Sequence, residues 1–506
     1  MKFIPRFLLT FLVLQLIACK ASQDNVRNVP SSTTANAVSE TITPTVSTST
    51  PESPPTETFL PQTPTQSPAA FSISARPSYS ITAKLDYSWR ILKVEQEIVF
   101  PNPSTDSISE LELVVQPNWR PDVFELIQIS IADGKSIDNY SLEGIRLRFS
   151  LPQALLPGDS LHLLLVYDIN IPPIQTSDDF QPIPFGYSSR QINLTDWYPF
   201  IPPYREGTGW IVHNPWYYGE HLVYPIADFE VNISINNAPE NTVIAASALD
   251  TGNKNLHRYR LDGARNFVWS VSHNYKVFHE QVGDTIVMSY SFPYDVAGGE
   301  AALKTTVEAL TLFNTLFGPY SFRSMTIVEA DFNHGMEYSG LYFLNNAFYG
   351  TYDGSNSSYL VTIAAHETAH QWWYGVVGND QALEPWLDEA LCTYSEKLFL
   401  ENLYPEALPW WEDVRVNYYE PSGWIDSSIY NTTGYRSYRD AIYLNGARFL
   451  DDLRDRVGED VFLQFLQDYL ITYTDQIASK TDFFNVLRDH TEVEITDLLS
   501  NYFQYP

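Results

Sequence analysis

The sequence predicts a multidomain α+β protein in which an all-β domain precedes a domain of mixed strands and helices. Between about residues 76 and 275, short alternating or apolar runs are separated by Pro, Gly and Asn, which is typical of an all-β domain. From about Ala297 the apolar residues recur every three or four positions, which indicates helices. A chain of 506 residues is long enough to bury two or three separate cores.

Residues 1–19 have the features of an export signal. A positively charged start, with Lys2 and Arg6, precedes the apolar run 7–17. The run ends in Leu-Ile-Ala-Cys, which resembles a bacterial lipobox, so Cys19 is the expected lipid attachment site; an ordinary signal peptide with an incidental cysteine is the alternative. Lipid on Cys19 would anchor the protein on the extracytoplasmic side of a bacterial membrane, at the cell surface or the periplasmic face.

Residues 20–70 are rich in Ser, Thr and Pro and almost free of aromatic side chains. Such a segment cannot bury enough apolar area to offset the entropy lost on ordering, so we expect a disordered tether. No later stretch is long and apolar enough to span a bilayer. If Cys19 carries lipid, Cys392 has no partner and the fold uses no disulfide.

The formal net charge of −31 argues against a nucleic-acid partner, because phosphate recognition needs clustered Lys and Arg. The charge fits a soluble exported enzyme. An acidic site would attract the ammonium group of a peptide N-terminus, although a solvated acidic surface accounts for most of the charge.

The β-rich N-terminal domain is expected to span residues 71–295. Its predicted strands are residues 92–100, 111–115, 145–149, 161–167, 229–235 and 267–271. The aromatic-rich segment 197–218 is a candidate wall of a substrate groove, although packing is the simpler explanation for most of its rings. The second domain, residues 296–506, is expected to contain a helix ending near Phe317, a strand at 324–330 and short helices after Gly458.

The most informative stretch of this second domain is His366-Glu367-Thr368-Ala369-His370. Small and aliphatic residues before it and two tryptophans after it predict a mostly buried helix. On a helix His366 and His370 lie one turn apart on the same face, where both imidazoles can bind one metal ion, and Glu367 lies on the adjacent flank as a base. Two unrelated surface histidines are the alternative.

A third ligand is expected from Glu389, which is separated from His370 by eighteen residues. Pro385 suits the first turn of a new helix, which can bring the carboxylate back to the metal. Two histidines and one carboxylate are typical of a catalytic zinc site with a position open for water. We therefore expect one Zn²⁺ per chain.

These motifs resemble those of the aminopeptidase N-like gluzincin metallopeptidases, peptidase family M1. In that family His-Glu-x-x-His is followed after eighteen residues by a glutamate in a Trp-Leu-Asn-Glu-Gly-like segment, and residues 386–390 here are Trp-Leu-Asp-Glu-Ala. The resemblance extends from about Tyr79 to the C-terminus. It implies a short lipoprotein form of the family, with a β-rich domain followed by a thermolysin-like catalytic domain of a small mixed sheet and helices.

Gly335-Met336-Glu337 resembles the family's Gly-x-Met-Glu-Asn signature, with His334 in place of the first Gly and Tyr338 in place of Asn. In the family this glutamate binds the α-amine of the substrate, so the resemblance implies that role for Glu337, with Gly335 and Met336 beside the substrate. A carboxylate paired with a desolvated ammonium discriminates against blocked N-termini. A glutamate with a purely structural partner is the alternative.

Tyr443 lies in a segment similar to the family's Tyr-x-Lys-Gly-Ala, whose tyrosine donates a hydrogen bond to the oxyanion. The resemblance implies this catalytic role for Tyr443, although Asn445 replaces the usual Lys and Tyr435 and Tyr438 are rivals.

Two further acids are expected near the metal ligands. Glu396 lies two helical turns beyond Glu389, where it can accept a hydrogen bond from a ligand histidine. Asp388 is a candidate for orienting the site, although an acidic residue suits the first turn of any helix.

The resemblance implies a zinc-dependent aminopeptidase that hydrolyses the N-terminal bond of extracytoplasmic peptides by metal-activated water. The sequence does not define the oligomeric state, and a monomer is favoured. A thermolysin-like endopeptidase and a catalytically inactive peptide-binding lipoprotein are the alternatives. A metzincin is excluded, because Trp373 and Val376 occupy the places of its Gly and third His.

Overall fold

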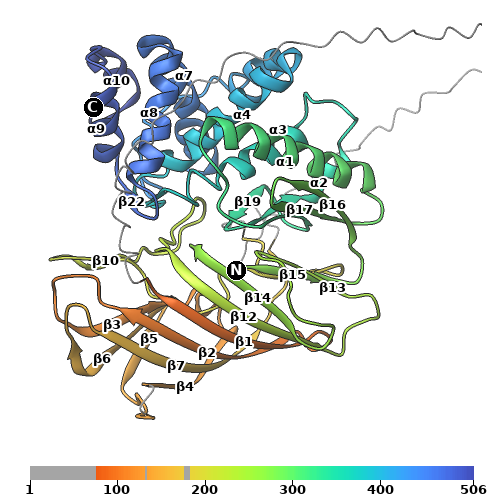
Figure 1. Ribbon diagram of the computed structural model, residues 1–506, viewed down its shortest axis with the longest axis vertical. Coiled ribbons are helices and arrows are strands. Elements are labelled where there is room, and N and C mark those ends of the chain that lie inside the picture. The colour runs from red at the N-terminus through yellow and green to blue at the C-terminus, as the bar shows by residue number, and fades with distance from the viewer. Residues whose placement is uncertain (1–75, 132–133, 176–182) are drawn as a thin grey trace, which may run out of the picture. The chain divides into compact units, whose positions relative to one another are not determined.

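The computed structural model describes residues 76–131, 134–175 and 183–506. The predicted export signal, Cys19 and the predicted tether lie outside the described residues. The described part has a strand-rich region followed by a region in which helices predominate (Figure 1). The predicted α+β class is confirmed.

The largest sheet of the strand-rich region has six strands in the order β14, β12, β1, β2, β7, β4. Their bounds are His257–Ala264, Ala227–Asn236, Ser78–Asp86, Ile91–Pro101, Ser160–Asn170 and Phe124–Ile131. β1 runs parallel to β12, and the other neighbours are antiparallel. Buried and exposed side chains alternate along β1, β2 and β7, so one face of the sheet covers the core.

Two smaller sheets complete this core. One contains β3 (Ile108–Val114), β6 (Arg146–Leu155) and β5 (Tyr140–Glu143), and the other β13 (Val243–Ala246), β15 (Trp269–Ser272), β9 (Ile192–Leu194) and β8 (Gly186–Tyr187). A short hairpin joins β10 (Tyr204–Arg205) to β11 (Gly209–Trp210). Each of the six predicted strands overlaps an observed one. Trp197 and Tyr198 are buried in this core, so packing accounts for these rings of the segment 197–218.

The second region contains a five-stranded mixed sheet in the order β16, β17, β18, β20, β19. The bounds are Lys276–Val282, Thr285–Ser291, Ser324–Ala330, Leu341–Asn345 and Gly335–Tyr338. The three inner strands are parallel, and the edge strands β16 and β19 are antiparallel to them. The helix α1 (Val296–Leu316) connects β17 to β18 and packs on β16 and β17. Both α1 and β18 agree with the predicted helix and strand.

The remaining helices lie above this sheet in Figure 1 and follow one another to the C-terminus. They are α2 (Asn346–Gly350), α3 (Tyr359–Ala369), α4 (Trp386–Leu403), α5 (Leu408–Trp410), α6 (Tyr435–Arg439), α7 (Asn445–Val457), α8 (Glu459–Thr472), α9 (Lys480–His490) and α10 (Thr496–Tyr502). Two segments, Trp411–Val416 and Asp440–Leu444, are π-helical. Among the helices of the described residues, none has both the length and the apolar character that a membrane span requires.

Aromatic clusters fix the two helices that carry the site. Trp372 and Trp373, just beyond α3, pack against Phe313 and Phe317 of α1 and its C-terminal cap. Trp386, the first residue of α4, is completely buried and contacts four phenylalanine rings, those of Phe449, Phe483, Phe484 and Phe503. Large buried rings contribute most of the packing energy of such a core, so the C-terminal end of α3 and the first residue of α4 are both held in rigid positions.

The buried guanidinium of Arg265 joins the strand-rich region to the loop after α3. It donates hydrogen bonds to the carbonyl oxygens of Tyr224, Tyr374, Val376 and Gln476. Burial lowers its pKa to about 10. These four acceptors satisfy a cation that would otherwise be costly to bury.

Candidate metal centre and active site

The helix α3 supplies His366 and Glu367, and His370 is its C-terminal cap. The prediction placed the whole motif in one helix, whereas the helix ends at Ala369 and the two tryptophans lie beyond it. The backbone of His370 is still helical, with φ −59° and ψ −16°, so the two histidines keep the one-turn spacing. α4 starts after Pro385, as predicted, and carries Glu389 in its first turn.

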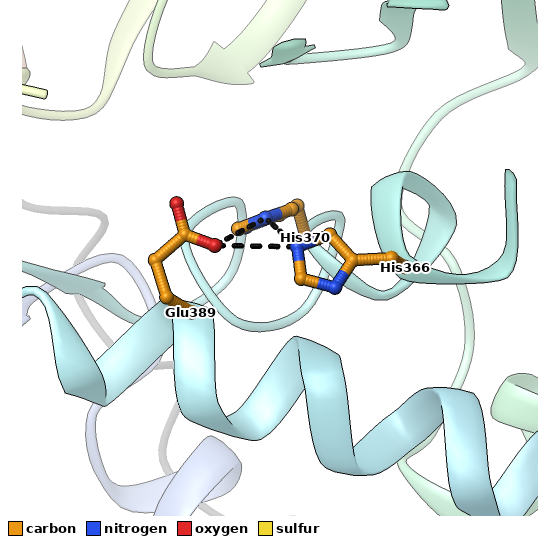
Figure 2. Close-up of side chains that lie close together, drawn as sticks. All are labelled: His366, His370 and Glu389. Carbon is orange, nitrogen blue, oxygen red and sulfur yellow. Dashed lines mark hydrogen bonds and ion pairs between the residues drawn. The ribbon is translucent and has the colours of Figure 1, made fainter. Parts of the chain in front are cut away.

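Three side chains meet between these helices (Figure 2). Nε2 of His366 lies 3.2 Å from Nε2 of His370 and 3.2 Å from Oε2 of Glu389. Nε2 of His370 lies 3.6 Å from the same carboxylate oxygen. All three residues are buried.

The partners of the other imidazole nitrogens decide what these three atoms can bind. Nδ1 of His370 lies 3.1 Å from the carbonyl oxygen of Trp373, and Nδ1 of His366 lies 2.9 Å from Oε1 of Glu396. Both partners are acceptors, so in each neutral imidazole Nδ1 carries the proton and Nε2 presents a lone pair. Two lone pairs and a carboxylate oxygen then face one another, and such a set of donors is suited to bind a metal cation.

The spacing of the three atoms fits a small tetrahedral ion. Tetrahedral ligands at the usual zinc distances of about 2.0–2.1 Å are separated by roughly 3.3 Å, which matches the observed separations. A second group of possible ligands, Glu337, Glu367 and His370, has atoms within 4.8 Å of one another. We favour the first group, because it uses both imidazoles and leaves Glu367 free to act as a base.

The contacts among these side chains also shift the pKa values of His366 and Glu389. Burial alone would lower the pKa of His366, but hydrogen bonds with Glu389 and Glu396 raise it to about 9. Burial would raise the pKa of Glu389, but hydrogen bonds with the two histidines lower it. The carboxylate of Glu389 is therefore kept ionised, as a metal ligand must be.

Glu396 accepts a hydrogen bond from Nδ1 of His366, on the side of the ring away from the candidate metal site. Two other side chains fix the carboxylate of Glu396. Arg415 donates from Nε to Oε2 (3.1 Å) and from Nη2 to Oε1 (2.7 Å), and Nε1 of Trp411 donates to Oε2 (2.7 Å). Burial would raise the pKa of Glu396, but the charge of Arg415 and the bond with His366 lower it. The structure thus places Glu396 where the sequence predicted a partner for a ligand histidine.

Glu367 lies beside the ligands with an unusual carboxylate. Burial raises its pKa to about 8, although the nearby histidines oppose the shift, and among the described residues its buried Oε2 has no hydrogen-bond partner. An unpaired, buried carboxylate beside a metal site is suited to take a proton from a water molecule.

Gly335 approaches Glu367 more closely than any other residue type could. A Cβ atom at Gly335 would lie 1.9 Å from Oε1 and 2.6 Å from Cδ of Glu367. Because the obstacle is the end of a flexible side chain, a larger residue would displace the carboxylate without unfolding the protein.

Gly335→Ala is therefore expected to lower kcat by roughly 10- to 100-fold, because a displaced base loses its alignment, and to change the melting temperature little. Gly434→Ala is the matched control, since nothing lies within 4 Å of a Cβ at that position. Kinetics and thermal melting of both variants check this. An unchanged kcat in Gly335→Ala would contradict the contact.

Glu337, on the edge strand β19, is buried and accepts a hydrogen bond from Gln381. Nε2 of Gln381 donates to Oε1 of Glu337 (3.1 Å) and to Oδ2 of Asp388 (2.9 Å). Burial raises the pKa of both acids, that of Asp388 to about 8. Asp388 also accepts from the backbone N–H of Glu389 at 2.8 Å. Asp388 is thus linked to Glu337 through Gln381, and to Glu389 through the backbone N–H of that residue.

The histidines and glutamates of this site lie in a part of the chain that is similar to a known protein family. Residues 301–502 match the model of the peptidase family M1 domain. This part of the chain is similar to the peptidase family M1 domain. The predicted resemblance is confirmed, and a group of histidines and glutamates that can bind a metal accords with a metallopeptidase family.

Curated relatives match a similar share of the chain. Aminopeptidase M1 of Arabidopsis thaliana is 28% identical over 220 residues, which is 40% of this chain and 25% of that protein. Aminopeptidase M1-B of Oryza sativa subsp. japonica is 27% identical over 220 residues, with the same coverage. Probable aminopeptidase 2 of Sulfurisphaera tokodaii is 22% identical over 241 residues, or 44% of this chain and 30% of that protein. The matched part thus spans a quarter to three tenths of these relatives.

Tyr443 lies within the matched residues 301–502, beside the candidate metal ligands. Its hydroxyl donates to Oε1 of Glu389 at 2.6 Å, and its ring stacks on His366 with centroids 6.0 Å apart. Of its rivals, Tyr438 is completely buried, and Tyr435 lines the cleft with its hydroxyl 3.2 Å from Nδ1 of His334. The oxyanion role of Tyr443 stays a prediction, with the geometry favouring it over Tyr438.

A cleft of about 290 Å³ opens onto the site, and a smaller cavity of about 40 Å³ adjoins it. Glu220 and Glu337 line both, while Met336 lines only the smaller one. Glu220 comes from the strand-rich region and has a buried Oε2 without a partner among the described residues. Burial and the charges of Glu389 and Glu337 raise its pKa well above its usual range.

Sequence reasoning missed several residues around the site: Glu220, Gln381, Arg415 and Arg439. The only signal for any of them was the aromatic-rich segment 197–218, which ends two residues before Glu220. Gln381, Arg415 and Arg439 belong to no motif that spacing alone reveals.

Proposed function

We propose that this protein is a zinc-dependent aminopeptidase that releases single residues from the N-terminus of peptides. The observation that carries this proposal is the position of Glu337. Its carboxylate lies within 4.8 Å of ligand atoms of Glu367 and His370. A substrate amine held there has its first carbonyl group close to the base, so cleavage is restricted to the first peptide bond.

The protein side chains have separate tasks in this reaction. Glu337, oriented by Gln381, binds the ammonium group. Glu367 accepts the proton of the attacking water at Oε2 and delivers it to the leaving amine. Tyr443, whose hydroxyl lies beside Glu389, donates to the carbonyl oxygen as negative charge develops there. The bound metal supplies a Lewis acid that polarises the carbonyl and lowers the pKa of water.

We propose Zn²⁺ as the metal because the donor set is two imidazole nitrogens and one carboxylate oxygen. Hard ions such as Mg²⁺ and Ca²⁺ take oxygen ligands instead. The test is to remove metal with a chelator and restore it with Zn²⁺, Mg²⁺ or Ca²⁺, following melting temperature and peptide hydrolysis. Zn²⁺ is expected to restore both. An equal response to Mg²⁺, or no loss of either on chelation, would contradict the proposal.

We further propose that the enzyme acts on extracytoplasmic peptides while anchored to a bacterial membrane through Cys19. The basic start, the apolar run and the lipobox-like sequence support this proposal. The full chain produced in bacteria with a labelled fatty acid is expected to incorporate the label, and Cys19→Ser to lose it. A wild-type protein without label would contradict the proposal.

A further inference from the structure

The two parts of the cleft lining differ in charge. Glu220 and Glu337 line the cleft where it adjoins the smaller cavity. Arg415 and Arg439 line the cleft but not that cavity. A zwitterionic ligand can place its ammonium group at the acidic part and a carboxylate at the basic part.

Arg415 is already paired and does not offer a ligand site. Its Nε and Nη2 both donate to Glu396, and 8% of its side chain is exposed. The charge of Arg415 is balanced by that carboxylate, and its task is to hold the partner of His366.

Arg439, the last residue of α6, is different. Its Nε and Nη2 donate to a single oxygen, Oδ1 of Asp440. In the described residues its Nη1 donates to no acceptor, and 23% of the side chain is exposed. A guanidinium has five N–H donors, so this one can still make a forked bond to an incoming carboxylate.

The guanidinium of Arg439 is also held in place. It lies 4.9 Å from the ring centroid of Tyr419, and Arg436 lies 4.4 Å from the same centroid. Tyr419 lines the cleft, but Arg436 does not. Stacking on an aromatic ring orients a guanidinium without using its hydrogen-bond donors.

We infer that Arg439 binds a carboxylate of the substrate on the leaving-group side of the scissile bond, so that short peptides with a free C-terminus are the preferred substrates. This inference rests on the proposed aminopeptidase function. The cleft volume of about 290 Å³ is close to the lower end of the range for small-ligand pockets, about 300–1,000 Å³, which favours short peptides over long ones. An acidic side chain just after the scissile bond presents the same chemical group.

The test compares kcat/KM for Ala-Ala, Ala-Ala-Ala and Ala-Ala-Ala-Ala with kcat/KM for their C-terminal amides and for Ala-Asp amide. The proteins are the wild type, Arg439→Gln, Arg439→Lys and Arg436→Gln. The wild type is expected to prefer the free acid by about tenfold at the length that spans the two charges. Arg439→Gln should abolish the preference with little change for the amides, Arg439→Lys should keep part of it, and Arg436→Gln should keep all of it. Melting temperatures show whether each variant is folded.

Equal kcat/KM for acids and amides in the wild type at every length would overturn the inference while leaving the aminopeptidase proposal intact. So would an equal loss of the preference in Arg436→Gln, which shares the ring of Tyr419 but does not line the cleft. A preference for Ala-Asp amide alone, lost in Arg439→Gln, would overturn the assignment to the C-terminus. No hydrolysis of any of these peptides would instead overturn the proposed function.

Discussion

Glu367→Gln is expected to lower kcat by roughly 10³-fold, within the range for loss of a general base, while the protein keeps its metal. Glutamine has nearly the same shape as glutamate but cannot take a proton from water. The buried Oε2 of Glu367 has no partner among the described residues, so the substitution breaks no structural hydrogen bond there. Stopped-flow or steady-state kinetics on a free-amine peptide, with the metal content of the purified variant, measure both effects.

Glu389→Gln is the matched control, because it removes a charge of the same kind from the ligand set that we favour. It should lose metal as well as turnover, and the histidine pair should lose its counter-charge. The comparison also separates the two possible ligand groups, since Glu367 belongs to the second. Loss of metal from Glu367→Gln, with metal retained in Glu389→Gln, would show that the second group binds the ion.

Glu337→Gln is expected to weaken binding of free-amine peptides by roughly 100-fold, because a buried ammonium is left without its counter-ion. N-acetylated analogues have no ammonium group, so their inhibition constants should change by less than about threefold. Inhibition constants for paired free and acetylated ligands measure the difference. An equal loss for both would leave Glu337 with only a structural task.

Asp388→Asn tests whether this effect is specific. Asp388 shares Gln381 with Glu337 but lines neither the cleft nor the smaller cavity. Asp388→Asn should therefore weaken the binding of free and acetylated ligands to a similar extent, and by less than Glu337→Gln weakens the binding of free-amine peptides.

Local periodicity and spacing were enough to predict the three side chains that the structure brings together as candidate metal ligands, because each was placed by one turn of one helix. His366 and His370 share the α3 turn, and Glu389 lies in the first turn of a helix that follows Pro385. β18 was predicted from end to end for a similar reason, since its seven residues are all buried. Such local patterns survive packing with little change.

Apart from the contact of Glu396 with His366, the supporting contacts were not predictable, because they join segments far apart in the chain. Gln381 and Glu337 are separated by 44 positions, and Tyr443 and Glu389 by 54. Arg439 and Glu220 reach the cleft from different regions of the fold. The packing of whole elements decides these contacts, and a single sequence carries no periodic signal for them.

His334 shows how a departure from a family motif is accommodated. His334 stands where the family signature has its first Gly, and the structure gives it a φ of 79°, a conformation that favours glycine. A left-handed conformation of a non-glycine residue costs of order 1–3 kcal/mol. Its ring lies against Tyr435, with centroids 4.8 Å apart and the hydrogen bond to the tyrosine hydroxyl, which offsets part of that cost.

The central claim is that the chain removes residues singly from a free N-terminus. Mass spectrometry of a tetrapeptide during hydrolysis, beside its N-acetylated form, tests it most directly. The free peptide should shorten by one N-terminal residue at a time, and the acetylated peptide should stay intact under the same conditions. Internal cleavage, or cleavage of the acetylated peptide at a comparable rate, would contradict the account and favour an endopeptidase.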